Sequence, residues 1–128
     1  VAGACTTVMK AIFDDQALFI SYVPHPKKVD PTDPTLLVNL TNNEGANQLT
    51  LGGELDKLAS SIAMARNFGG VHYRWDGEYG LQLGEEVGIR FLQDHARTYP
   101  EIGFTGYVLT KRNGQRIRVT ENSVTVIS

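Results

Sequence analysis

The sequence has little of what would point to a disulfide-stabilised or membrane-spanning protein. It contains a single cysteine, Cys5, so no internal disulfide can form, and no Cys/His spacing is typical of a zinc site. Its longest uninterrupted apolar runs are a few residues, whereas a membrane-spanning helix needs roughly 20. We therefore predict a soluble chain with no membrane partner. The sequence leaves the cellular compartment unassigned.

Strong charge of either sign is also missing. The formal net charge of the 128 residues is −2, charged residues make up 20%, and the basic ones are scattered. Such a surface does not favour binding to nucleic acid or to an anionic membrane. The hydrophobic content of 41% is enough for one modest core, so the chain is predicted to be one domain or part of one.

The beginning of the chain also lacks expected features. It starts with Val1 rather than methionine, and nothing caps the helix predicted for residues 1–13. The basic flank and the cleavage pattern of a secretory signal are missing as well. We interpret the start as the result of truncation or processing. Cys5 is predicted to be buried and inert on this helix of small residues.

Two further helices are predicted after a long loop at residues 14–49, which contains four of the five prolines. Thr50 is the expected N-cap of a helix over 50–67, and Gly69 and Gly70 end it. Its apolar stripe is predicted to face a core and consists of Leu55, Leu58, Ala59 and Ile62. The third helix is expected over 77–99. One of its faces is predicted to be apolar, with small residues that indicate close approach by another helix: Leu81, Gly84, Val87, Gly88, Phe91 and Leu92.

The last part of the chain predicts β-structure. Alternating segments flank Asn113 and Gly114, a strong hairpin signal, and Val124–Val126 would add a third strand. The predicted fold is therefore mainly α. It is part of a helical bundle of about three helices, with a small antiparallel β-hairpin or meander over 103–127.

Arg66 is the first candidate for chemistry. It follows Leu55 by eleven residues, close to three helical turns, so it continues the apolar stripe and should leave the helix from the buried side. A buried guanidinium requires an anionic partner. Its planar donors suit phosphate-like oxyanions particularly well.

His72 and Asp76 follow Arg66 at intervals of six and four residues. An imidazole can act as nucleophile, acid, base or metal ligand, and a nearby carboxylate can hold its second ring nitrogen. The alternative is a chance grouping in which Asp76 simply caps the third helix. Three other histidine and aspartate positions, His25, Asp30 and Asp33, are interpreted as exposed loop residues, and His95 as a structural histidine.

The segments Gly53 to Arg66, Asn67 to Asp76 and Leu83 to Glu86 resemble the vanadium-dependent bromoperoxidases of algae and cyanobacteria. Weaker similarity at residues 2–4 and 8–11 extends the resemblance to nearly the whole chain. The pattern Arg-x5-His-x3-Asp also resembles a signature of the wider superfamily, which includes type 2 phosphatidic acid phosphatases and bacterial acid phosphatases. The flanking residues and the hairpin favour the haloperoxidase branch.

This resemblance implies a vanadate cofactor held in a helical bundle. By that resemblance His72 is the axial ligand to vanadium, Arg66 binds vanadate oxygens, and Asp76 orients His72. The implied substrates are hydrogen peroxide, a halide (bromide by the resemblance) and a small organic acceptor. The implied product is hypohalous acid or an equivalent oxidised halogen.

The sequence also departs from this family. The family's upstream lysine and arginine motif and its Pro-Ser-Gly-His segment do not precede Arg66 in these 128 residues. The chain is therefore interpreted as a C-terminal part of a haloperoxidase that supplies at most half of the oxyanion cage and is inactive alone. A homo-oligomer or a complementing N-terminal half are its expected partners. Two alternatives stay open: a phosphatase that uses His72 as nucleophile, and a non-catalytic helical interaction module.

Overall fold

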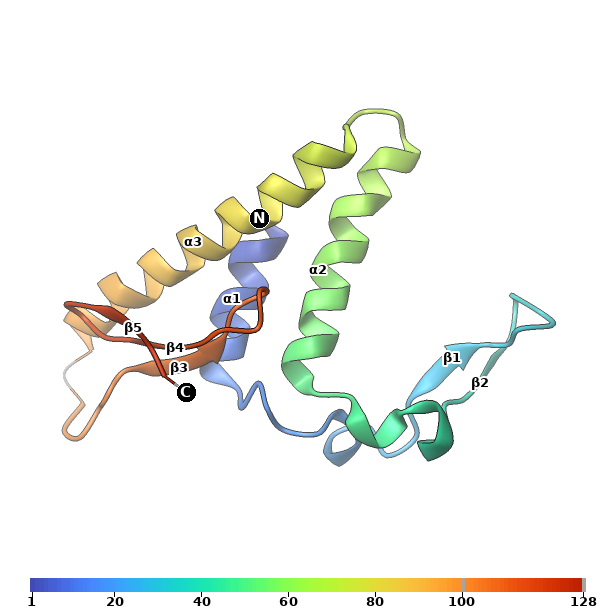
Figure 1. The fold of residues 1–128 in the computed structure, drawn as a ribbon, viewed down its shortest axis with the longest axis horizontal. Helices are drawn as coiled ribbons and strands as arrows, with labels where there is room; N and C mark the ends of the chain where they lie inside the picture. The colour runs from blue at the N-terminus through green and yellow to red at the C-terminus, as the bar shows by residue number, and fades with distance from the viewer. Residues whose placement is uncertain (100, 128) are drawn as a thin grey trace.

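The computed structural model describes residues 1–99 and 101–127. Its main elements are the helices α1 (Ala2–Ile12), α2 (Leu51–Phe68) and α3 (Arg74–Thr98), followed by a small sheet near the C-terminus (Figure 1). The predicted mainly α architecture with a terminal β-meander is confirmed. The division of the chain into domains stays a prediction.

The short helix α1 packs closely against α3, because glycines line both sides of their crossing. A Cβ atom added at Gly84 would lie 2.9 Å from the backbone nitrogen of Ala4, and one added at Gly88 would lie 2.9 Å from Cβ of Thr7. The close approach predicted from the small residues of α3 is thus confirmed. The remainder of the predicted apolar face is only partly buried, since Val87 and Phe91 are more than half exposed.

The buried face of α1 is small and polar rather than apolar. Gly3, Thr6, Thr7 and Lys10 are buried, at the spacing of one helical face. The Thr7 hydroxyl donates a hydrogen bond to the Gly3 carbonyl at 2.7 Å, so this buried hydroxyl has a partner within its own helix. Cys5 points to the other side of the helix and is exposed, so the prediction that it is buried was wrong.

Helix α2 begins as predicted, with the Thr50 hydroxyl accepting the Gly53 N–H at 3.1 Å. Its predicted apolar stripe is only partly covered. Leu55 and Ala59 are buried, but Leu58 and Ile62 are 51% and 50% exposed. The last turns of α2 extend beyond the start of α1 (Figure 1), so α1 leaves that end of the stripe uncovered.

The connection between α2 and α3 is shorter than predicted. Gly70 has a φ of +67°, as expected for the turn after a helix. The third helix, however, begins at Arg74 instead of residue 77. The Asp76 carboxylate accepts the backbone N–H of Tyr73 at 2.8 Å, so it stabilises a first turn that starts three residues earlier.

The C-terminal strands β3 (Tyr107–Thr110), β4 (Arg116–Val119) and β5 (Val124–Val126) form an antiparallel sheet in the order β3-β4-β5. Gly114 has a φ of +85° in the β3–β4 turn, so the predicted hairpin is confirmed. One face of the sheet packs on α3 and forms the hydrophobic core, whose buried members are Ile89, Leu92, Leu109, Ile117 and Val119.

The predicted loop at residues 14–49 contains more structure than expected. Strands β1 (Lys27–Val29) and β2 (Leu37–Asn39) form an antiparallel hairpin that projects from the molecule (Figure 1). Three short 3-10 helices accompany it: η1 (Phe19–Ser21), η2 (Asn42–Glu44) and η3 (Ala46–Gln48). The Asp30 carboxylate accepts hydrogen bonds from the backbone and hydroxyl of Thr32, which closes the hairpin turn between prolines.

Glu44 ties this hairpin to η2 and gives a testable pH dependence. Its carboxylate contacts the Lys28 ammonium and accepts the backbone and hydroxyl hydrogens of Thr41. The contact with Lys28 is the main reason that the pKa of Glu44 falls from 4.5 to about 2. Because the folded-state pKa is lowered, the stabilisation is present above pH 4.5 and is lost as the pH falls through about 2.

We expect NMR titration to show that Glu44 stays ionised at pH 3. In Lys28→Met, its titration should move upward toward 4.5. Lys57→Met, which removes an exposed ammonium on α2, is the control and should leave Glu44 unchanged. An unchanged Glu44 titration in Lys28→Met would contradict this explanation.

No helix in the described part of the chain combines the length and apolar character that crossing a bilayer requires.

Candidate functional site

A cleft of about 510 Å³ lies between the start of α1, the second half of α2 and the first turns of α3. Arg66, His72 and Asp76 all line it. The structure thus places the three predicted site residues around one space. Each of them comes from a different local setting: the last turn of α2, the connecting segment and the first turn of α3.

Arg66 lies on the side of α2 that faces the cleft, but it is exposed. The prediction of a buried guanidinium was wrong, because the apolar stripe that it continues is itself uncovered at this level of the helix. No carboxylate forms an ion pair with Arg66 within residues 1–99 and 101–127. Its donors are therefore available to an oxyanion.

His72 and Asp76 lie next to each other at the mouth of the cleft. The His72 Nδ1 atom is 3.5 Å from Oδ2 of Asp76, and the two side chains are 43% and 51% exposed. The same Asp76 oxygen accepts the Tyr73 N–H. Asp76 is therefore the third residue of α3. The prediction that it is the N-cap residue was wrong, because that position is held by Tyr73. The carboxylate can both fix the helix start and orient the imidazole.

Small residues keep the walls of this cleft open. Gly3 and Gly77 lie on two of its sides, and a Cβ atom added at Gly80 would meet nothing within 4 Å. The remaining lining is largely apolar, with Ile62, Ala63 and Leu81. An oxyanion could thus approach the guanidinium without displacing a large side chain.

The cleft brings together three chemical groups. They are the positively charged guanidinium of Arg66, the ring nitrogen of His72 that does not face Asp76, and the Asp76 carboxylate that can orient the ring. Such a set can hold a tetrahedral oxyanion, with the imidazole either binding its central atom or attacking it. Among the residues that the structure describes, no lysine or serine side chain lines the cleft. Nor do three or more His, Cys, Asp or Glu side chains gather there into a metal-chelating group.

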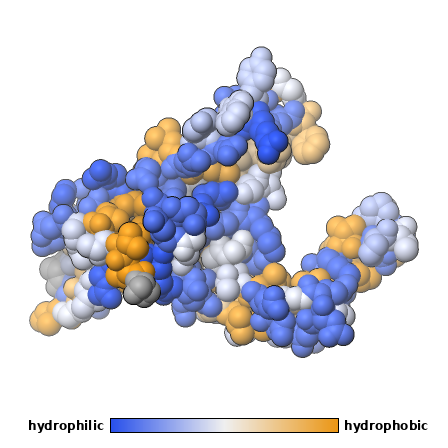
Figure 2. Space-filling view, in the orientation of Figure 1, coloured by the Kyte–Doolittle hydropathy of each residue, from blue (hydrophilic) through white to orange (hydrophobic). Residues whose placement is uncertain are grey.

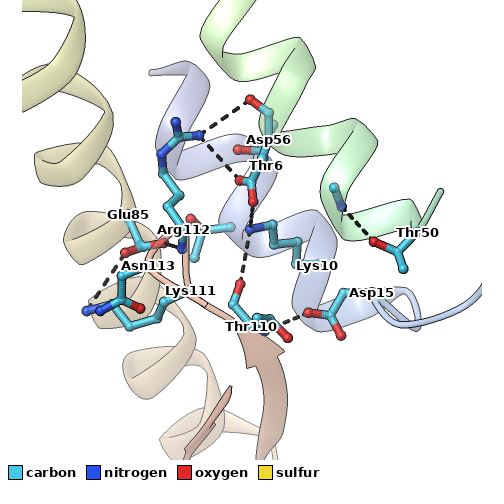
Figure 3. A network of polar contacts seen from close by, with 12 residues as sticks. Thr6, Lys10, Asp15, Thr50, Asp56, Glu85, Thr110, Lys111, Arg112 and Asn113 are labelled. Carbon is cyan, nitrogen blue, oxygen red and sulfur yellow. Dashed lines mark hydrogen bonds and ion pairs between the residues drawn. The ribbon is translucent and has the colours of Figure 1, made fainter. Parts of the chain in front are cut away.

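A buried network of charges that the sequence did not predict lies farther along α1 (Figure 3). The Lys10 side chain is 2% exposed, and its ammonium donates to Oδ2 of Asp56 at 2.6 Å and to the Thr110 carbonyl at 3.0 Å. This contact joins α1, α2 and β3. One signal was present in the sequence: Lys10 follows Gly3 by seven residues and so shares its helical face.

The β3–β4 turn completes the network. The Arg112 guanidinium donates to Oδ1 of Asp56 at 3.3 Å and to the Ser60 hydroxyl at 3.1 Å, while its backbone N–H donates to the buried Glu85 at 2.7 Å. The sheet is thereby tied to both α2 and α3. Together with the Lys10 contacts, these hydrogen bonds join α1, α2, α3 and the sheet.

The other predicted positions lie away from the cleft. His25 is exposed, and Asp30 and Asp33 accept hydrogen bonds within the β1–β2 turn. The Nδ1 atom of His95 is 2.5 Å from the Tyr107 hydroxyl, in a cluster of aromatic rings at the other end of the molecule.

Comparison with known proteins gives three similar sequences. The chain is 38% identical over 119 residues to a vanadium-dependent bromoperoxidase of Corallina pilulifera and 37% identical over 119 residues to that of Corallina officinalis. It is 37% identical over 113 residues to the vanadium-dependent bromoperoxidase of Ascophyllum nodosum. These matches cover 93%, 93% and 84% of the chain.

The resemblance to vanadium-dependent bromoperoxidases predicted from the sequence is therefore confirmed. The chain spans only 18–19% of the length of these relatives. No family model matches the chain, and no solved structure does.

Proposed function

We propose, from this similarity, that the chain is part of a vanadium-dependent halide peroxidase and contributes Arg66 and His72 to its vanadate site. The observation that supports the proposal is that both side chains line one cleft in a chain whose relatives are bromoperoxidases. The proposed reaction is the oxidation of halide, bromide in particular, by hydrogen peroxide, with a small organic molecule as acceptor of the oxidised halogen.

The residues present fit a vanadate ion. The Arg66 guanidinium has no ion-pair partner in the described part of the chain, and the small residues beside it leave space. His72 would bind the vanadium, and Arg66 would donate hydrogen bonds to the oxygens. When bound, the vanadate activates hydrogen peroxide toward attack by halide.

The protein residues provide charge and orientation. Asp76 would hold a proton on the facing Nδ1 atom of His72, which leaves the Nε2 lone pair for the ligand bond. The fixed charge of Arg66 would offset the negative charge of the oxyanion at any ordinary pH, because a guanidinium does not lose its proton. Neither His72 nor Arg66 needs to gain or lose a proton in these roles.

We further propose that this chain alone is inactive. One guanidinium and one half-exposed imidazole form a partial cage, and the relatives are about five times longer than the matched region. The missing donors would come from polypeptide outside these 128 residues, either a complementing N-terminal half or a second copy. Exposed apolar side chains near the tip of the α2–α3 hairpin, such as Phe68 at 93%, support coverage by such a partner (Figure 2).

The experiment that tests this function uses the longer protein that contains this chain, loaded with orthovanadate. Bromination of a dione by peroxide is measured beside hydrolysis of a phosphate ester. His72→Ala should abolish bromination, and Asp76→Asn should lower it about 10–100-fold, the usual effect of losing a carboxylate that orients a ligand. His25→Ala removes an exposed histidine far from the cleft and should change nothing.

Bromination that survives His72→Ala would overturn the proposal. Hydrolysis of the phosphate ester without bromination would instead support the phosphatase alternative. The isolated 128-residue chain is expected to show no bromination and no saturable binding of vanadate, whereas tight binding would show that its own residues complete the cage.

A further inference from the structure

A second cleft, of about 590 Å³, lies at the opposite end of α1. This open cleft is lined by the ends of α1 and α3 and by strand β3, with Phe13 and Asp14 from the end of α1 and Tyr99, Phe104 and Tyr107 from the C-terminal part of the chain. Helix α1 has 11 residues, so the two clefts are separated by about 16 Å along its axis. No residue of this second cleft belongs to the proposed vanadate site.

One wall of this cleft is aromatic and well fixed. The rings of Phe104 and Tyr107 pack edge to face with centroids 4.9 Å apart, and Tyr99 packs on Phe104 at 6.0 Å. His95 stacks on Tyr99 and lies 2.5 Å from the Tyr107 hydroxyl. Burial raises the pKa of the Tyr107 phenol, which therefore stays neutral at ordinary pH. The wall thus consists of aromatic rings that hold one another in place.

The charge around this cleft is negative. Asp14 and Glu101 line it, and neither forms an ion pair in the described part of the chain. Arg116 also reaches the cleft, but its guanidinium lies 3.5 Å from the buried carboxylate of Asp15, which balances it. The carboxyl-terminal ends of α1 and α3 add the partial negative charge of their unpaired carbonyls.

We propose that this cleft binds an organic cation of the quaternary ammonium class. Aromatic faces attract such a cation through their quadrupoles, and the two carboxylates supply long-range attraction. An anion would meet Asp14 and Glu101, and a neutral aromatic molecule would gain nothing from them. The proposal does not depend on peroxidase function, so its test needs no vanadate.

The test is an NMR titration of the 128-residue chain with choline and, separately, with its uncharged isostere 3,3-dimethylbutan-1-ol. Choline should bind saturably and at least about tenfold more tightly than the alcohol, because only the cation gains from the aromatic rings and the carboxylates. Signals of Tyr99, Phe104 and His95 should shift together. The signals of His72 should not.

Two variants examine the two sources of attraction. Phe104→Leu removes an aromatic face, and Glu101→Gln removes a charge from an exposed position without altering the packing. Each should weaken choline binding about three- to tenfold. Tyr22→Leu and Glu78→Gln are the matched controls outside this cleft and should leave the affinity unchanged.

Equal affinity for choline and the alcohol, or no saturable binding of choline, would overturn the proposal. An equal loss in the control variants would do the same. Circular dichroism checks that each variant is folded. If Phe104→Leu does not fold, Glu101→Gln decides the outcome, because its side chain makes no contact that the fold requires.

Discussion

Replacing Lys10 by methionine is expected to lower the free energy of unfolding of this chain by about 3 kcal/mol. Breaking a buried ion pair from one side usually costs about 3–5 kcal/mol, because the partner charge stays behind. The value should fall at the lower end here, since Asp56 is 28% exposed and keeps Arg112 as a second partner. The Thr110 carbonyl, which accepts from Lys10 at 3.0 Å, also loses its donor.

Urea denaturation followed by circular dichroism measures this effect. Lys57→Met is the matched control, because Lys57 is 63% exposed and pairs with Glu54 on the surface of the same helix that carries Asp56. Its loss should cost less than about 0.5 kcal/mol. If Lys10→Met were as mild as Lys57→Met, the buried pair would not be what holds α1 to α2.

This network illustrates what the sequence could not predict. Lys10 is 46 residues from Asp56 and 100 from Thr110 along the chain, and no local pattern joins positions so distant. Features set by neighbouring residues were predicted correctly. They include the Thr50 cap, the Gly114 hairpin turn and the order of the C-terminal strands.

The prediction that Arg66 is buried was wrong for a different reason. Helical periodicity correctly placed Arg66 on the same side as Leu55, but it says nothing about which neighbour covers that side. Since α1 begins below this level of α2, the Arg66 side chain borders an open cleft instead of a core. Similarly, the start of α3 was misplaced because Tyr73 is not a usual cap residue, and the capping contact comes from Asp76.

The second large effect on stability is expected at the crossing of α1 and α3. Gly88→Ala adds a Cβ atom that would lie 2.9 Å from Cβ of Thr7 and 3.0 Å from the carbonyl oxygen of Ala4. Neither atom is at the end of a flexible side chain, so the two helices must separate. Overpacking of this kind costs about 1–3 kcal/mol. Part of it is offset by the better helix propensity of alanine.

The same substitution at Gly80 is the control that separates the packing cost from helix propensity. Gly80 lies in the same helix, but an added Cβ atom there would meet nothing within 4 Å. Gly80→Ala should therefore stabilise the chain by about 0.5–1 kcal/mol through propensity alone. The difference between the two midpoints of urea denaturation then reports the packing cost at the crossing.

Gly88→Ala also bears on the candidate site, because α1 forms one wall of the cleft. Gly88→Ala should move the start of α1 away from α3, so backbone NMR signals of Gly3 and Leu81 should shift although both residues lie at least one helical turn from the substitution. If Gly88→Ala is as stabilising as Gly80→Ala, the close approach of the helices is not a constraint. The cleft around Arg66 and His72 would then have a less rigid wall than the crossing implies.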